Sequence, residues 1–118
     1  MSFPICGAVG AVLNSALDGV AERQRVIADN IANVDTPGYR ATSVDFESSL
    51  RAAIASGDVS SEAAPTTIAT NTPVGANGNN VDLRKETMAA VQSQFQYQML
   101  TRAVSDRFDL IRTAAGGQ

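Results

Sequence analysis

Few side chains of this sequence could perform acid–base or nucleophilic chemistry. Its 118 residues include no histidine and one cysteine, Cys6, which stands in an apolar stretch without a neighbouring base. A thiol in such a setting usually packs as a small hydrophobic group, because the reactive form of cysteine is the thiolate. Asp106 and Asp109 share one helical face, but the arginines beside them are typical of a solvated or interfacial charge face. The sequence therefore predicts no catalytic residues, no metal site and no cofactor.

Signals for ligand binding are also sparse. The glycines of VGANGNN, residues 74–80, lack the strand-before, helix-after context and the lysine of a phosphate-binding loop, so a turn is expected there. The net charge is −3 and no basic run occurs, which argues against nucleic acid and against an anionic membrane surface as partners. No stretch approaches the ~20 apolar residues of a membrane span. No small-molecule substrate is expected, since the sequence offers no convergent set of polar pocket residues.

The most distinctive polar stretch is NIANVDTPGYR, residues 30–40, which ends a long apolar-striped segment. Pro37 lacks an N–H and pushes Thr36 out of the helical region, so a helix cannot run through this point. Pro37 and Gly38 fit the central pair of a type II turn, with Gly38 at positive φ. Asn33 suits the left-handed position just past a helix end. The stretch therefore predicts a helix stop that is followed at once by a tight turn.

A long helix is expected before this stop, over residues 8–34. Its apolar positions alternate spacings of four and three, which is a heptad seam interrupted by Gln24. The seam consists of Leu13, Leu17, Val20, Ile27, Ile31 and Val34. At about 1.5 Å per residue the helix would be ~40 Å long. A helix of that length in so short a chain needs a partner for its seam.

The middle of the chain is expected to be irregular. Residues 39–44 are typical of a short extended piece, and Asp45 can cap a brief helix that ends at Gly57. Residues 56–80 contain neither lysine nor arginine and are rich in Ser, Thr, Asn and Gly, so a loop or disordered linker is expected, with a weak strand around Ile68. The middle should therefore hold at most a short helix and a weak β-hairpin.

A second long helix is expected over residues 82–115, with Asp82 as its N-cap. The segment QSQFQYQM, residues 92–99, alternates polar and apolar residues as a strand would, but no turn signal interrupts it and its residue types favour helix. The helix carries an apolar stripe that drifts along its length. This stripe consists of Met88, Val91, Phe95 and Met99, continued by Leu100, Val104, Phe108 and Ile111.

Together these elements predict an all-α dominated fold in which two long helices form a coiled-coil-like pair. The chain is expected to be a single domain, 1–118, made of helix 8–34, an irregular segment 35–81 and helix 82–115. Aromatic residues are 5% of the chain, so a thick core is not expected and the seams should gain much of their stability from association. The N-terminal apolar stretch has no lysine or arginine before it, which argues against a cleaved signal peptide.

Two short motifs carry a family resemblance. One has the pattern N-x-A-N-x-x-T-P-G-Y and the other the pattern N-x-V-D-L. They are formed by Asn30, Ile31, Ala32, Asn33, Thr36, Pro37, Gly38 and Tyr39, and by Asn79, Val81, Asp82 and Leu83. Both resemble motifs of the flagellar axial protein family, the rod, hook and filament-junction proteins of bacteria. The resemblance covers residues 13–50 and 77–115, and the segment VDFESSL and the short chain make it strongest for the proximal rod.

This resemblance implies a structural, non-enzymatic subunit of the basal-body rod, which crosses the periplasm and cell wall. It implies export from the cytoplasm through the flagellar type III apparatus without a cleaved signal. The implied partners are further copies of the chain, other rod subunits, and membrane-ring or adaptor proteins. Asn30 and Asn33 would bond carbonyls of their own helix end or groups of an adjacent subunit, unless both are merely solvated. Two alternatives stay open: a sister short rod subunit, and a helical-hairpin adaptor or secretion chaperone.

Overall fold

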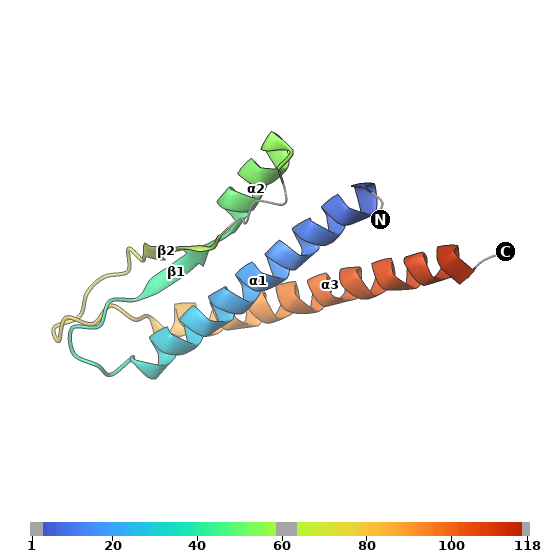
Figure 1. Cartoon of the computed structure of the whole chain (residues 1–118). Coiled ribbons are helices and arrows are strands. Elements are labelled where there is room, and N and C mark those ends of the chain that lie inside the picture. Colours follow the sequence, from blue (N-terminus) through green and yellow to red (C-terminus); the bar gives the residue numbers. More distant parts are fainter. Residues whose placement is uncertain (1–3, 59–63, 117–118) are drawn as a thin grey trace.

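Two long helices set the shape of the molecule. The computed structural model describes residues 4–58 and 64–116, whose elements follow the order α1, β1, α2, β2, α3 (Figure 1). α1 spans Pro4–Ala32 and α3 spans Leu83–Gly116, within a few residues of the expected bounds. The helices lie antiparallel, closed together where α1 ends and α3 begins, and they diverge toward the two termini. The expected pair of long terminal helices is confirmed.

A short arm packs along α1, on a face next to the one that contacts α3 (Figure 1). The arm consists of β1 (Thr42–Asp45), α2 (Glu47–Ser56) and β2 (Thr66–Ala69). The two strands pair antiparallel, with Thr42 opposite Ala69. The short helix and the weak hairpin expected for the middle of the chain are therefore both present.

Local polar chemistry sets the helix ends. Oδ1 of Asp45 accepts a hydrogen bond from the backbone N–H of Ser48 at 3.1 Å, which closes the first turn of α2. Gly57 ends that helix at φ +78, and its N–H donates to a carbonyl of the last turn. Oδ1 of Asp82 accepts from the N–H of Lys85 at 3.2 Å and caps α3 in the same way. These three ends could be predicted because each depends on residues a few positions apart.

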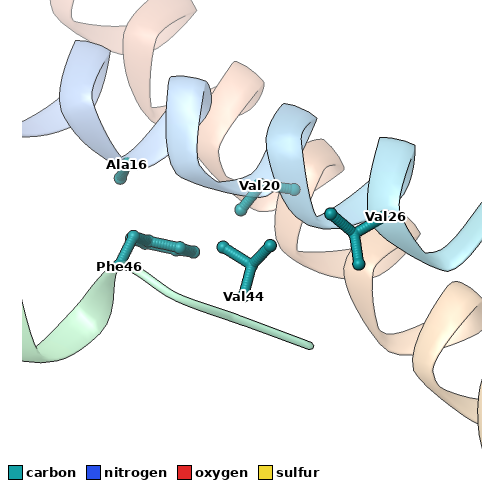
Figure 2. Packing of buried hydrophobic residues seen from close by; sticks show 5 residues of the cluster. All are labelled: Ala16, Val20, Val26, Val44 and Phe46. Carbon is teal, nitrogen blue, oxygen red and sulfur yellow. The ribbon is translucent and has the colours of Figure 1, made fainter. Parts of the chain in front are cut away.

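The core is a thin layer between α1 and the arm (Figure 2). Its members are small, β-branched and aromatic side chains from α1, β1 and the residue before α2. They are Ala16, Val20, Val26, Val44 and Phe46, with Leu50 and Leu100 packed against them. Full burial of a side chain of Val or Phe size contributes about 1.5–3 kcal/mol. Because only Leu100 comes from α3, this core ties α1 to the arm more than it ties α1 to α3.

The molecule is long and flat. Its principal extents are 67 × 27 × 15 Å and its radius of gyration is 18.0 Å. A compact domain of this length would have a radius of gyration of about 13 Å. A thickness of 15 Å accommodates little more than one layer of side chains between two elements. Much of the apolar surface of the helices therefore stays on the outside.

The loops around the arm differ in part from expectation. Asn33 is not left-handed, since no residue other than glycine has a positive φ in the part of the chain that the structure describes. Instead the N–H groups of Val34 and Thr36 donate three residues back, so α1 unwinds through tight turns before the proline. Residues 64–80 form β2 and a hydrogen-bonded loop, while residues 59–63 of the expected linker lie outside the described residues.

Candidate functional site

The two motif-bearing loops meet at the closed end of the helical pair. The N–H of Tyr39 donates to the carbonyl of Thr36 at 3.2 Å and Gly38 has φ +76, so the expected type II turn is confirmed. The N–H of Gly38 donates to the carbonyl of Asn77 at 2.9 Å. Gly78, at φ +81, lies so close that a Cβ on it would stand 3.2 Å from Cα of Gly38. The VGANGNN loop therefore packs directly on the TPGY turn.

Asn30 connects this turn to the arm and to α3. Its side chain is fully buried, at 0% exposure. Its Nδ2 donates to the carbonyl of Thr42 at 2.7 Å and to Oε1 of Glu86 at 2.9 Å. Its Oδ1 accepts from the hydroxyl of Tyr39 at 3.2 Å and from the N–H of Thr42 at 3.3 Å. The partners of Asn30 thus lie far along the same chain, and not at its own helix end as one of the expectations had it.

Asn33 does bond its own helix end. Its Nδ2 donates to the carbonyl of Asp29 at 2.8 Å, which satisfies a carbonyl of the last turn of α1. Its Oδ1 accepts from the hydroxyl of Thr36 at 3.0 Å, just before the proline. The side chain therefore bridges the end of α1 and the start of the turn, and this expectation is confirmed.

Two asparagines from the loop before α3 complete the network. Nδ2 of Asn79 donates to the carbonyls of Asn33 and Thr36, both at 2.8 Å. Oδ1 of Asn80 accepts from the N–H of Ala41 at 2.6 Å. Each described buried side-chain nitrogen and oxygen has a hydrogen-bond partner, so the network is closed. We call this set the asparagine clasp; it consists of Asn30, Asn33, Asn79 and Asn80.

Arg23 is a second connecting residue, and the sequence did not single it out. Its guanidinium donates to both carboxylate oxygens of Glu47, at 2.6 and 2.8 Å, and to the carbonyl of Val44 at 2.7 Å. It also donates to Oε1 of Gln96 at 3.2 Å and lies 4.7 Å from the ring centroid of Phe46. One side chain of α1 therefore contacts β1, α2 and α3. Arg23 lies one helical turn after Val20, which belongs to the core cluster. This spacing was the signal in the sequence that could have identified Arg23.

The seam expected on α1 is largely turned inward. Val20 and Ile27 are buried, at 0% and 7% exposure, and Leu13, Leu17 and Ile31 are half-buried. The core of α1 is wider than this seam, because Ala16 and Val26 also face the arm. The helix therefore uses two adjacent faces, one toward α3 and one toward the arm.

The stripe expected on α3 is turned outward. The exposed fractions are 62% for Met88, 53% for Val91, 62% for Phe95 and 69% for Met99. Phe108 is also 62% exposed, whereas Leu100 and Val104 are half-buried. The first four side chains therefore do not pack on α1 within one chain, and the role of Met88, Val91 and Phe95 in a helix–helix assembly seam stays a prediction. We call these four residues the outer stripe.

A different face of α3 contacts α1. Glu86 and Ser93 are buried, at 5% and 0% exposure, and Gln96 reaches Arg23. We call this the inner face; it consists of Glu86, Ala89, Ser93, Gln96, Leu100 and Val104. At about 100° per residue, the centre of the outer stripe lies about 140° around the helix axis from the centre of the inner face. The two sets of side chains therefore point in clearly different directions from α3.

Charged groups of α1 form one exposed cluster and one partly buried pair. Arg25 donates to Glu22 and Asp29 at 2.8 Å each, as expected from their i, i+3 and i, i+4 spacings. Its hydrogen bond lowers the pKa of Glu22. The hydrogen bond from Arg23 lowers the pKa of Glu47, against desolvation that acts in the opposite direction. Both shifts are caused by ion pairs that favour the charged form of the carboxylate.

The described residues hold neither a metal-binding cluster nor a helix that could span a membrane. Within residues 4–58 and 64–116, no group of three or more Cys, Asp and Glu side chains could hold a metal ion. Across the same residues, no helix combines the length and hydropathy needed to cross a membrane. The side chain of Cys6, expected to be an inert hydrophobic group, lies outside the described part of the structure.

The fold is a thin pair of terminal helices that leaves large apolar side chains exposed. Residues 12–40 match the family model for the flagella basal body rod protein. The chain is 36% identical over 117 residues to the flagellar basal body rod protein FlgB of Bacillus subtilis, an alignment that covers 89% of this chain and 91% of that protein. It is 37% identical over 110 residues to FlgB of Escherichia coli (76% and 80% coverage) and 32% identical over 116 residues to FlgB of Borreliella burgdorferi (80% and 86% coverage). The chain therefore belongs to the FlgB family of flagellar basal body rod proteins.

Membership of this family decides among the alternative functions that the sequence left open. The resemblance to the flagellar axial proteins is confirmed, and the chain is a structural subunit of the rod in the flagellar basal body. A rod subunit assembles with other components of the rod. The matched region includes the whole of the NIANVDTPGYR stretch, so the asparagine clasp is built partly from the family's own motif.

Proposed function

We propose that residues 1–118 act as one rod-type domain, which assembles into the proximal rod through the outer stripe of α3. In this proposal the chain is exported through the flagellar type III apparatus without a cleaved signal and has no enzymatic activity. Its direct neighbours are further copies of itself, other rod subunits, and membrane-ring or adaptor proteins. The observation that supports the proposal is the exposure of four large apolar side chains in a row, between 53% and 69% each.

Such a row needs a partner on physical grounds. Large apolar side chains gathered in one exposed patch, as opposed to scattered singly, mark sites of association. Methionine and aromatic residues are enriched at such interfaces, and Met88, Phe95 and Met99 supply both types. Burial of each side chain that is now exposed would contribute up to about 1.5–3 kcal/mol to the association. Association through this face would therefore recover burial that the thin monomer does not provide.

The test is a charge placed on the outer stripe. Phe95→Asp should leave the monomer folded, because the ring is 62% exposed there. It should prevent incorporation into the rod, since an unpaired carboxylate would have to be desolvated at the interface. Ser105→Asp is the matched control, because it adds the same charge at an exposed position of α3 that lies off the outer stripe. Swimming, the amount of exported subunit and the amount in purified basal bodies are measured together.

Different outcomes separate the proposal from its rivals. Loss of incorporation with normal export for Phe95→Asp, and normal swimming for Ser105→Asp, would support it. Normal swimming of Phe95→Asp would contradict it. Sedimentation of the purified protein at rising concentration adds an independent test: open-ended growth would support self-association through the outer stripe, whereas a defined dimer would contradict it.

A further inference from the structure

α3 keeps its larger apolar side chains outward, which hydrophobic burial alone would not select. Phe95 and Met99 of the outer stripe are 62% and 69% exposed, while Glu86 and Ser93 of the inner face are 5% and 0% exposed. Hydrophobic burial is the dominant favourable contribution to folding and is not directional, so it would favour the opposite rotation of this helix. We therefore look to directional contacts of the buried polar side chains Glu86 and Ser93 for what holds the inner face against α1.

The most buried directional contact between the two helices is the hydrogen bond from Asn30 to Glu86. It is 2.9 Å long and both side chains are almost completely buried. The Asn30 amide cannot turn away, because its other hydrogen bonds hold it to the turn and to both backbone groups of Thr42. Its orientation is thus fixed by the arm, and its remaining bond reaches across to α3.

The position of Glu86 gives this bond influence over the whole helix. Glu86 lies in the first turn of α3, which begins at Leu83. Because a helix is rigid about its own axis, the direction fixed at one residue sets the direction of all others. The bonds further along are weaker constraints: Gln24 to Gln94 is 3.4 Å and exposed, and Arg23 to Gln96 is 3.2 Å.

We propose that the Asn30–Glu86 pair is a rotational latch, a pair of positioning residues that selects which face of α3 is presented to other molecules. A buried polar pair in a helical seam commonly lowers stability while it specifies one register. Here it specifies one rotation, which keeps the outer stripe available. Without the latch, α3 turns to bury Met88, Val91 and Phe95 against α1. The use of the exposed face for assembly rests on the proposed function, but the rotation itself is a property of the single chain.

The latch is tested in dilute monomer with methionine as a native probe. Oxidation of Met88 and Met99 by dilute peroxide adds one oxygen to each thioether and releases water, and peptide mass spectrometry measures its rate. In Glu86→Ala the rate at Met88 should fall several-fold, because burial shields the sulfur, while far-UV circular dichroism stays helical. Glu86→Gln keeps an oxygen that can accept from Asn30 and should restore the fast rate. Thr87→Ala, an exposed neighbour, is the control.

A double variant separates rotation from simple loosening. Adding Phe95→Gln to Glu86→Ala removes much of the apolar drive for rotation, so Met88 should again be oxidised as fast as in the natural chain. Unchanged oxidation in Glu86→Ala, or loss of its helical signal, would overturn the latch and leave the pair a purely stabilising role. Persistent slow oxidation in the double variant would also overturn it. These readouts do not involve assembly, so normal swimming of Phe95→Asp would refute the proposed interface and leave the latch standing.

Discussion

The ring of Phe46 lies against Gly19 so closely that a Cβ at position 19 would overlap three ring carbons. Phe46 is 5% exposed. The guanidinium of Arg23 lies over the ring, 4.7 Å from its centroid. In Figure 2 the ring lies between Ala16 and Val44. A helix residue without a side chain is therefore what allows the arm to dock on α1.

This contact predicts opposite effects for two glycines of α1. In an exposed helix interior, Gly→Ala stabilises by about 1 kcal/mol. Gly10→Ala should show that gain, because nothing lies within 4 Å of the added carbon. Gly19→Ala should lose stability, because displacing a buried ring costs about 1–3 kcal/mol and exceeds the gain in helix propensity. Urea midpoints measured by circular dichroism test this. A raised midpoint for Gly19→Ala would mean that the arm docks in another way.

The bond between Arg23 and Glu47 predicts a dependence on acidity. The hydrogen bond from Arg23 lowers the pKa of Glu47 from its ordinary 4.5, so the folded state binds this proton less readily than the unfolded state. The stabilisation is therefore complete above the ordinary pKa of 4.5 and is lost as the pH falls through the lowered value. The effect should be modest because Glu47 is 42% exposed. Urea midpoints of the natural chain and of Glu47→Gln, measured between neutral and acid pH, should converge at the acid end. A constant difference would contradict this.

The TPGY turn packs on the VGANGNN loop through Gly38 of the turn and Gly78 of the loop. This contact predicts that substitutions of the two glycines lower stability by different amounts. Both Gly38 and Gly78 have positive φ, where a side chain costs about 1–2 kcal/mol. Gly38→Ala meets open space, so this backbone penalty is its whole cost. Gly78→Ala would in addition press on Cα of Gly38 at 3.2 Å and should separate the loops. We expect a larger fall in the urea midpoint for Gly78→Ala, with faster amide exchange at Gly38, whose N–H bonds Asn77. Equal costs would show that the contact contributes nothing.

The inward seam predicts where charge cannot be tolerated. Leu17 and Leu100 are half-buried, and Leu100 packs on the core cluster. An aspartate at either position would lose several kcal/mol through unpaired desolvation, so Leu17→Asp and Leu100→Asp should abolish swimming while export continues. Asp18→Ala and Arg25→Ala, on the exposed face, should swim nearly normally. Normal swimming of both leucine variants would refute the pairing, and failure of the exposed-face variants would show that the charged face meets a neighbour.

The helices and their caps could be predicted because each depends on residues a few positions apart. Asp82 and Gly57 perform the capping roles that their residue types suggest, whereas the N-cap of α2 is Phe46, and Asp45, one residue earlier, accepts from the N–H of Ser48. The type II turn followed from Pro37 and Gly38 for the same reason. Local chemistry therefore accounts for where each element begins and ends.

The orientation of α3 could not be predicted because it depends on distant residues. The apolar periodicity of the outer stripe predicts a buried helix face, but these side chains are exposed in the single chain. Asn30 and Glu86 are 56 positions apart, and Arg23 and Gln96 are 73 positions apart, so no local pattern links them. A polar pair outweighed an apolar stripe, and only tertiary structure reveals which one faces α1.

The 15 Å thickness of the molecule has a thermodynamic consequence. An ordinary domain of 118 residues would unfold with a heat-capacity increase of about 1.4–1.8 kcal/mol/K, which reflects newly hydrated apolar surface. A slab this thin has little such surface left to hydrate, so the free chain should unfold with a smaller increase and a flatter dependence of stability on temperature. The missing heat capacity should reappear as a negative change on association, because that is where the remaining apolar surface leaves water.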